Sequence, residues 1–262
     1  MKQVNLKTSE EVELLRLNNQ LVSATLAALA PRVKPGAKTG DLDRFAEEFI
    51  CDHGAKPGFK GYCGYPYTLC ISVNDVVVHG MPGDYELQEG DIVSIDCGTL
   101  MHGFYGDSAY TFAVGAISPE AQRLIDVTRE SLEVGIRAAL HGNRTGDVGN
   151  AVQQHVQAYG YGVVREMVGH GLGRSMHEEP EVPNYGKAGS GKLLSAGMVI
   201  CIEPMITLGR HAIVQERDGW TIRTRDHSLA VHFEKAVAIT KGEPDVLTTY
   251  KEIDEAVAAS RS

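Results

Sequence analysis

The sequence predicts an α+β protein made of two similar halves, and three observations support this. A β-hairpin is expected at residues 93–110 ("VSIDCGTLMHGFYGDSAY"), where two strand-like runs flank a tight turn. Helices are expected over residues 8–29, where apolar residues recur at mostly helical spacing, and over residues 118–140. A faint internal repeat links the first half of the chain to the second.

Each helix of the predicted set has its own boundary signal. The first begins with a capping-box pattern, Thr8 followed by Glu11, and the second is stopped by Gly54. The third carries Pro119 in its first turn. The four expected helices cover residues 8–29, 39–54, 118–140 and 145–160. Between them, a Gly- and aromatic-rich loop covers residues 55–68, and strand-like runs cover residues 69–80, 90–98, 107–115, 163–169, 197–206, 220–226 and 229–240.

The internal repeat pairs two segments of each half at almost one offset. "KTGDLDRF" at residues 38–45 is similar to "RTGDVGNA" at residues 144–151, an offset of 106 residues. "LQEGDIVSID", which ends at Asp96, is similar to "LSAGMVICIE", which ends at Glu203, an offset of 107 residues. If the halves face each other across a pseudo-twofold axis, both carboxylates point into one central site.

Composition excludes several classes of protein. The chain has 262 residues, 43% of them hydrophobic, which is enough for one large core or two fused halves. With 34 acidic and 25 basic residues and no basic run, a nucleic-acid surface is not expected. No apolar run is long enough to span a membrane, and the start lacks the apolar region of a signal peptide. Five cysteines without a C-x-x-C pattern predict reduced thiols and a cytoplasmic protein.

The predicted hairpin carries one aspartate on each strand. With the turn placed at Met101–His102, Asp107 lies directly opposite Asp96, on the same face. Two such charges repel, and a metal ion makes the pair favourable. A protonated pair or a solvated surface pair is the alternative.

Three further residues extend this aspartate pair to a possible metal centre. His170 lies between two glycines, and Glu203 and Glu234 each lie within an apolar, strand-like run. A lone glutamate in a strand is usually at an edge or in solvent, but two such residues favour coordination. Four carboxylates match the charge of two divalent cations. Oxygen-rich ligation with one imidazole favours Mn²⁺, Fe²⁺, Co²⁺ or Zn²⁺.

Five segments of the chain resemble those of the methionine aminopeptidases: "VNDVVVHGMP", "IDCGTLMHGFYGD", "VGHGLGRSMHEEP", "CIEPM" and "FEKAVAIT". The resemblance covers roughly residues 5–248. It implies the pita-bread fold, in which two pseudo-twofold-related halves with an antiparallel sheet covered by helices hold a dinuclear site, here as one catalytic domain over residues 1–262. Only about 25 residues separate His177 from Glu203, and there is no long N-terminal extension, as in the type I, bacterial-style subclass.

The resemblance also implies a role for each site residue. Asp96 chelates the first metal, and His170 and Glu203 complete the second. Asp107 and Glu234 bridge the two ions, and a metal-activated hydroxide attacks the scissile carbonyl. Glu203 also acts as general base and proton shuttle. The remaining catalytic residues are His177, which donates to the oxyanion, and His79, which contacts the scissile amide nitrogen.

A pocket for the methionine side chain is implied by the same resemblance. Besides His79 and His177, it comprises Phe59, Tyr62, Tyr65, Cys70, Met176 and Trp220. Two of these depart from the family pattern, because Phe59 replaces a smaller residue and Met176 replaces a phenylalanine. We interpret them as one compensating exchange of volume. Cys63 replaces a frequent histidine. Asn74 and Val76 match positions of a loop that binds a monovalent cation in members of the family.

The expected function is removal of the initiator methionine from nascent proteins whose second residue is small. Such an enzyme acts in the cytoplasm, as a monomer, on polypeptide N-termini near the ribosome exit region, without a membrane or a specific nucleic acid as partner. An Xaa-Pro aminopeptidase or prolidase of the same fold is the alternative, and a non-catalytic binding module is a third hypothesis. The sequence leaves open the physiological metal and whether this copy is the sole one in its organism.

Overall fold

The computed structural model describes residues 4–260, so the first three residues of the expected N-terminal segment lie outside the described range. All four expected helices are present, and a fifth, not expected, lies at the C-terminal end. The helices are α1 (Ser9–Leu29), α2 (Thr39–Asp52), α3 (Pro119–Ala138), α4 (Thr145–Gln157) and α5 (Lys251–Ser260). Thr8 and Glu11 form the capping box of α1, and Pro119 is the first residue of α3, as predicted. Of the helices in residues 4–260, none is long and apolar enough to cross a bilayer.

Within residues 4–260 the strands form four sheets. The first contains β1 (Lys56–Pro57), β2 (Leu69–Val73), β4 (Ile92–Met101) and β5 (Phe104–Ala113). The second has the order β15 (Asp245–Val246), β14 (Lys235–Ala238), β9 (Val199–Ile202), β7 (Gly169–Gly171) and β8 (Glu178–Val182). Two smaller sheets consist of β13 (Ala230–His232), β10 (Met205–Thr207) and β6 (Gly162–Val163), and of β11 (Ile213–Gln215), β12 (Ile222–Thr224) and β3 (Val76–Val78).

Four of the expected strands are interrupted. The run over residues 69–80 is divided into β2 and β3, which belong to different sheets. The strand predicted over residues 163–169 is not continuous. Its two ends belong to β6 and β7, which lie in different sheets, and the residues between them are in neither strand. The run over residues 197–206 breaks after β9, where Pro204 has no N–H for a ladder. The run over residues 229–240 breaks between β13 and β14. The last two breaks occur where the chain passes between the second sheet and the β13–β10–β6 sheet.

The repeat seen in the sequence is present in the backbone hydrogen bonds. The N–H of Thr39 donates to the carbonyl of Tyr85 (3.0 Å), and the N–H of Thr145 donates to that of Lys192 (2.9 Å). Isolated β-bridges occur at the same offsets: Lys38 with Glu86, and Arg144 with Leu193. The start of each second helix is therefore tied in the same way to the segment that leads into β4 or β9.

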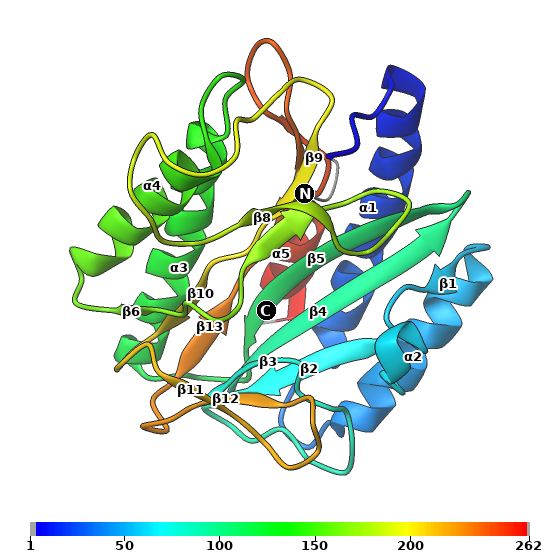
Figure 1. Ribbon diagram of the computed structural model, residues 1–262. Coiled ribbons are helices and arrows are strands. Elements are labelled where there is room, and N and C mark those ends of the chain that lie inside the picture. The colour runs from blue at the N-terminus through cyan, green and yellow to red at the C-terminus, as the bar shows by residue number, and fades with distance from the viewer. Residues whose placement is uncertain (1–3, 261–262) are drawn as a thin grey trace.

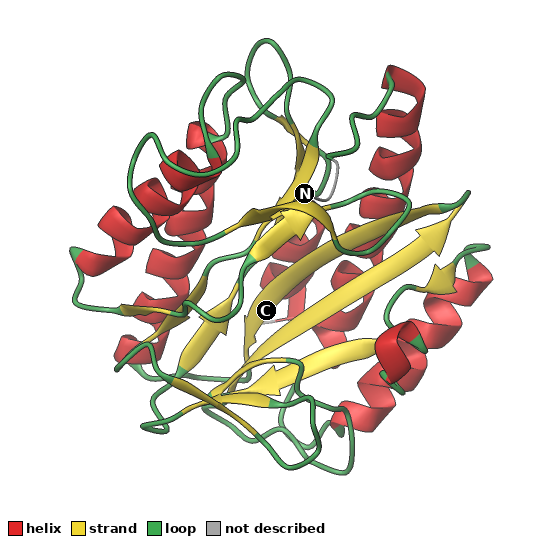
Figure 2. Cartoon of the chain, viewed as in Figure 1, coloured by secondary structure: helices red, strands yellow, loops and turns green. Residues whose placement is uncertain are grey.

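The helices cover the sheets from the outside. Figures 1 and 2 show α1 and α2 on one side of the molecule and α3 and α4 on the other, with strands between them. The largest apolar cluster lies between these helices and the strands and includes Leu26, Leu124, Ile95 and Ile202, all fully buried. The two halves meet where the carbonyl of Ala109 in β5 accepts a hydrogen bond from Glu234 N–H (3.0 Å). Acidic residues of both halves lie at this junction.

Candidate metal centre and substrate cavity

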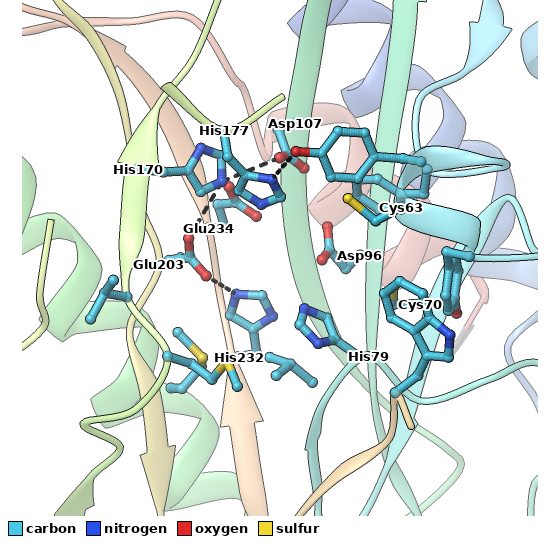
Figure 3. Close-up of a pocket in the computed structure, with 18 residues that line it drawn as sticks. Cys63, Cys70, His79, Asp96, Asp107, His170, His177, Glu203, His232 and Glu234 are labelled. Atoms are coloured by element: carbon cyan, nitrogen blue, oxygen red, sulfur yellow. Dashed lines mark hydrogen bonds and ion pairs between the residues drawn. The ribbon is translucent and has the colours of Figure 1, made fainter. Parts of the chain in front are cut away.

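One cavity of about 310 Å³ lies at the junction of the two halves. All five predicted metal ligands, Asp96, Asp107, His170, Glu203 and Glu234, line it. Figure 3 shows their side chains converging from β4 and β5 on one side and from the second half on the other. The convergence predicted from the internal repeat is therefore present.

The hairpin places Asp96 and Asp107 on one face, but not directly opposite each other. Asp96 is paired with Ala109, and Asp107 with Gly98, so the predicted register is wrong by two residues. The turn lies one residue later than predicted, because His102 (φ 55°) and Gly103 (φ 78°) both have positive φ, as a two-residue type I′ turn requires. A shift of two residues preserves the face, so the two carboxylates still meet diagonally.

Glu203 and Glu234 lie at breaks between strands, not within continuous strands as predicted. Glu203 follows β9 and Glu234 precedes β14, and these two strands pair with each other. The backbone of Glu234 is fixed by the Tyr250 hydroxyl, which donates to the Glu234 carbonyl (2.7 Å). The amide of Asn184 donates to the carbonyl of Glu203 (2.9 Å). These bonds fix the backbone of both glutamates, which lie just outside the hydrogen-bond ladder between β9 and β14.

His170 enters the cavity from β7 and is flanked by two positions where only glycine fits. A Cβ at Gly169 would lie 2.3 Å from the carbonyl oxygen of Cys201, and one at Gly171 would lie 2.3 Å from that of Glu179. The Nδ1 atom of His170 is 3.0 Å from the carbonyl oxygen of Gly171, which only accepts, so Nδ1 carries the proton. The Nε2 lone pair then faces the centre, as a metal ligand requires.

Burial dominates the electrostatics of the centre. It raises the pKa of Asp96 to about 7 and raises the pKa of Asp107, Glu203 and Glu234 well above the usual range, with repulsion between the carboxylates adding to the effect for the last three. Burial also lowers the pKa of His170 to about 3. Without a cation, these groups can only be neutral or repel one another.

The donor set fits divalent metal ions. One oxygen each of Asp96, Asp107 and Glu234 is buried and has no hydrogen-bond partner within residues 4–260. His170 Nε2 lies 3.6 Å both from Asp107 Oδ2 and from Glu203 Oε1. Burying such oxygens without a partner costs folding free energy unless a cation contacts them.

Cys201 was not predicted to belong to the centre. Its Sγ atom lies with donor atoms of Asp107, His170 and Glu234, all within 4.8 Å of one another. Burial raises the pKa of the Cys201 thiol well above its usual value, and the thiol hydrogen-bonds to Glu234. A protonated thiol is a donor to Glu234, so the oxygen-rich ligand set is retained.

Aromatic side chains form the opposite wall of the cavity. The rings of Tyr65 and Trp220 meet edge to face with centroids 5.0 Å apart, and the Tyr65 hydroxyl donates to the Leu69 carbonyl (2.9 Å). Tyr62 OH lies 2.8 Å from His177 Nδ1 at the mouth. Seven of the eight residues predicted to bind substrate line the cavity: Phe59, Tyr62, Tyr65, Cys70, His79, His177 and Trp220.

Met176 is the exception among the predicted substrate-binding residues. It is fully buried in the same apolar cluster as Phe59 and is absent from the cavity lining. A methyl group added at Gly98 would lie 2.6 Å from Phe59 Cε1 and 2.9 Å from Met176 Cε, so the two side chains share the space above this glycine. Met176 therefore supports the pocket from behind.

Several cavity residues were not assigned a role from the sequence: Cys63, Val78, Met167, Val168, Met205 and His232. His232 is the polar residue among them that is buried, at 2% exposure. The signal that identified Glu234, a polar residue inside an apolar run, applies equally to His232 two residues before it. The apolar members gave no signal, because buried strand residues have the same composition whether or not they face a cavity.

Comparison with known proteins assigns the chain to a family. The model of metallopeptidase family M24 matches residues 13–241. The methionine aminopeptidase of Clostridium perfringens is 51% identical over 94% of this chain and 99% of its own length. Methionine aminopeptidase 1 of Bacillus subtilis is 43% identical over 92% of this chain and 98% of its own length. The chain belongs to the methionine aminopeptidases of family M24.

Solved structures of methionine aminopeptidases confirm the pita-bread fold. The enzyme of Rickettsia prowazekii superposes with a TM-score of 0.93 at 37% identity, covering 94% of this chain and 100% of that chain. A prolidase of Pyrococcus furiosus superposes with a TM-score of 0.74 at 24% identity, and the match covers 93% of this chain but 65% of that one. The likeness to the prolidase extends to the fold alone.

Proposed function

We propose that this chain is a metal-dependent exopeptidase that removes the N-terminal methionine of new polypeptides when the second residue is small. One observation carries the proposal: an acidic centre built from both halves opens directly onto an aromatic, sulfur-lined compartment. The first is suited to hydrolysis, and the second to a thioether, which favours aromatic edges and soft neighbours. We further propose that residues 1–262 act as a single catalytic domain.

Two divalent ions, Co²⁺, Mn²⁺, Fe²⁺ or Zn²⁺, would be held by Asp96, Asp107, His170, Glu203 and Glu234. The buried oxygens without partners support this assignment. Bound ions of this kind lower the pKa of water and polarise a carbonyl at neutral pH. Near Asn74 and Val76 we propose a monovalent cation. The Asn74 side chain there is fixed by Asp91, to which its amide donates (2.8 Å).

The chain's own residues would handle the protons. Glu203 lines the cavity and would accept the proton of the water that attacks the scissile carbonyl, then pass it to the leaving amine. When Tyr62 OH donates to His177 Nδ1, the His177 Nε2 carries the proton and would donate to the developing oxyanion. His79 would contact the scissile nitrogen. Burial lowers the pKa of His79 to about 4, so it is neutral at pH 7.

An Xaa-Pro aminopeptidase or prolidase is the second candidate, since such enzymes share the fold. The Tyr65–Trp220 wall favours methionine instead, because aromatic rings beside the acidic centre make good contacts with a thioether side chain. We propose that the protein works as a monomer in the cytoplasm, on polypeptide N-termini that emerge near the ribosome exit region. Neither a membrane nor a specific nucleic acid is proposed as a partner.

A peptide assay separates the two candidates. The protein is stripped with a chelator, reloaded with Mn²⁺ or Co²⁺, and given Met-Ala-Ser, Met-Leu-Ser and Ala-Pro-Ala. We expect metal-dependent release of methionine from Met-Ala-Ser and no cleavage of Ala-Pro-Ala. Release from Met-Leu-Ser should be at least about 100-fold slower, because the bulky second residue clashes in a small subsite. Preferential cleavage of Ala-Pro-Ala, or activity that persists in chelator, would overturn the proposal.

A further inference from the structure

His232 has a buried nitrogen that the proposed chemistry does not use. It is the last residue of β13, and its ring lines the cavity with 2% of the residue exposed. Its Nε2 atom is fully buried and has no hydrogen-bond partner among the described residues. A buried donor without a partner costs about 1–3 kcal/mol, so its retention in a cavity wall needs a reason.

The unpartnered nitrogen faces Glu203. Nε2 of His232 lies 3.7 Å from Glu203 Oε2, while Nε2 of His170 lies 3.6 Å from the other oxygen, Oε1. The Glu203 carboxylate is thus held between two imidazoles. Figure 3 shows His232 between Glu203 and His79, on the side of Glu203 away from His170.

The backbone of His232 is anchored to the β4–β5 hairpin that also carries Asp96 and Asp107. The hydroxyl of Thr111 donates to the His232 carbonyl (2.8 Å), and the N–H of His232 donates to Ser94 Oγ (3.3 Å). The backbone position from which the His232 ring projects is therefore fixed. Replacing the side chain leaves these backbone hydrogen bonds intact.

We propose that His232 is a positioning residue for Glu203. Its Nε2–H is directed at Oε2 and limits rotation of the carboxylate, so that Oε1 stays turned toward His170 and the metal centre. This inference rests on the role proposed above for Glu203. Partners that orient a ligating carboxylate typically change metal affinity or activity about 10- to 100-fold when removed.

Two substitutions separate positioning from packing. His232→Leu fills the same space without a donor, and His232→Gln restores an N–H at the end of a side chain of similar length. His155→Leu is the matched control: its Nε2 lies 3.3 Å from Glu130 Oε2, between α4 and α3 and outside the cavity lining. Glu203→Gln tests the role of Glu203 itself.

The readouts are kcat and KM for Met-Ala-Ser, calorimetric titration of the stripped protein with Mn²⁺, and the melting temperature. We expect His232→Leu to lower kcat about 10- to 100-fold with little change in KM, and to weaken one Mn²⁺ binding step by a similar factor. His232→Gln should recover most of both losses, and His155→Leu should match wild type.

The proposal is overturned if His232→Leu keeps the wild-type kcat and Mn²⁺ affinity, or if His232→Gln is as impaired as His232→Leu. When either occurs and Glu203→Gln is inactive, the proposed function stands and only the positioning role is lost. A Glu203→Gln variant with wild-type kcat would instead remove the role of Glu203 and that of His232 together.

Discussion

Asp96 and Asp107 meet diagonally across the β4–β5 hairpin, with Asp96 paired to Ala109 and Asp107 paired to Gly98. Neither carboxylate has a cationic side chain beside it, among the ion pairs of residues 4–260, apart from His170 at 3.6 Å from Asp107. Two acids that face each other in a buried wall make the folded metal-free protein sensitive to pH.

The metal-free protein should lose stability as the pH rises from 6.5 to 8. In this window the folded protein holds protons on carboxyls whose pKa burial has raised, to about 7 for Asp96 and well above its usual value for Asp107, whereas the unfolded chain has released them near pH 4. The folded state then binds more protons, so the free energy of unfolding falls with pH. Buried histidines such as His170, with its pKa lowered to about 3, act in the opposite direction, but only below about pH 7.

Calorimetric melting in chelator and in Mn²⁺ measures this effect. The melting temperature should fall with pH in chelator, fall less in Mn²⁺, and fall less in Asp107→Asn than in wild type. A melting temperature in chelator that rises or stays level from pH 6.5 to 8 would contradict the electrostatic account.

Phe59 and Met176 should show coupled effects on methionine binding. Because both contact the space above Gly98, Phe59→Cys opens the pocket and removes an aromatic partner of the thioether. Such contacts contribute about 0.3–1.5 kcal/mol, so KM for Met-Ala-Ser should rise about 2- to 10-fold. Adding Met176→Phe should recover part of the loss. Steady-state kinetics of the single and double variants test this, with Phe45→Cys on α2 as the control, and strictly additive effects would refute the exchange of volume.

Alkylation of Cys63 should block the enzyme. Its side chain is exposed and lines the cavity (Figure 3), whereas Cys70, Cys97 and Cys201 are buried. A bulky maleimide on Cys63 would obstruct peptide entry, so treated wild type should lose most activity and Cys63→Ser should keep it. Cys51 is also exposed but lies on α2 outside the cavity, so Cys51→Ser should remain as sensitive as wild type. Equal inhibition of Cys63→Ser would disprove the assignment.

Asp43 should matter for stability through the loop that forms the aromatic wall. Its Oδ1 accepts hydrogen bonds from the N–H groups of Thr68 (3.0 Å) and Leu69 (2.8 Å), and all three residues are buried. Asp43→Ala leaves two buried donors without a partner, at a cost of about 2–4 kcal/mol. Urea unfolding should show this loss, while Asp52→Ala at the exposed end of the same helix stays within about 0.5 kcal/mol of wild type. A small loss for Asp43→Ala would mean that water replaces the carboxylate.

Residue chemistry and the repeat were sufficient to predict two similar halves and the five proposed metal ligands that meet in the cavity, whereas the pita-bread fold was implied by the family resemblance. Polar residues in apolar runs are costly without a partner, so Glu203 and Glu234 could be identified before their surroundings were known. The offset of the repeat then placed Asp96 and Glu203 at equivalent points of the two halves.

The sequence was insufficient where the backbone departs from regular geometry. The hairpin register depends on a positive φ at His102, which the residue type does not indicate, so the turn was placed one residue early. The breaks at Glu203 and Glu234 depend on which sheet each strand joins, which is a property of tertiary packing. His232 was overlooked because its proximity to Glu203, 3.7 Å between Nε2 and Oε2, arises from tertiary packing that the sequence pattern does not show.

The most direct test of the account is an anomalous-scattering map from crystals of the protein loaded with Mn²⁺. We predict two peaks in the cavity, with Asp107 and Glu234 in contact with both, Asp96 in contact with one, and His170 and Glu203 in contact with the other. An empty cavity, or a single ion bound by Asp107, His170, Glu234 and the Cys201 sulfur, would contradict the dinuclear centre.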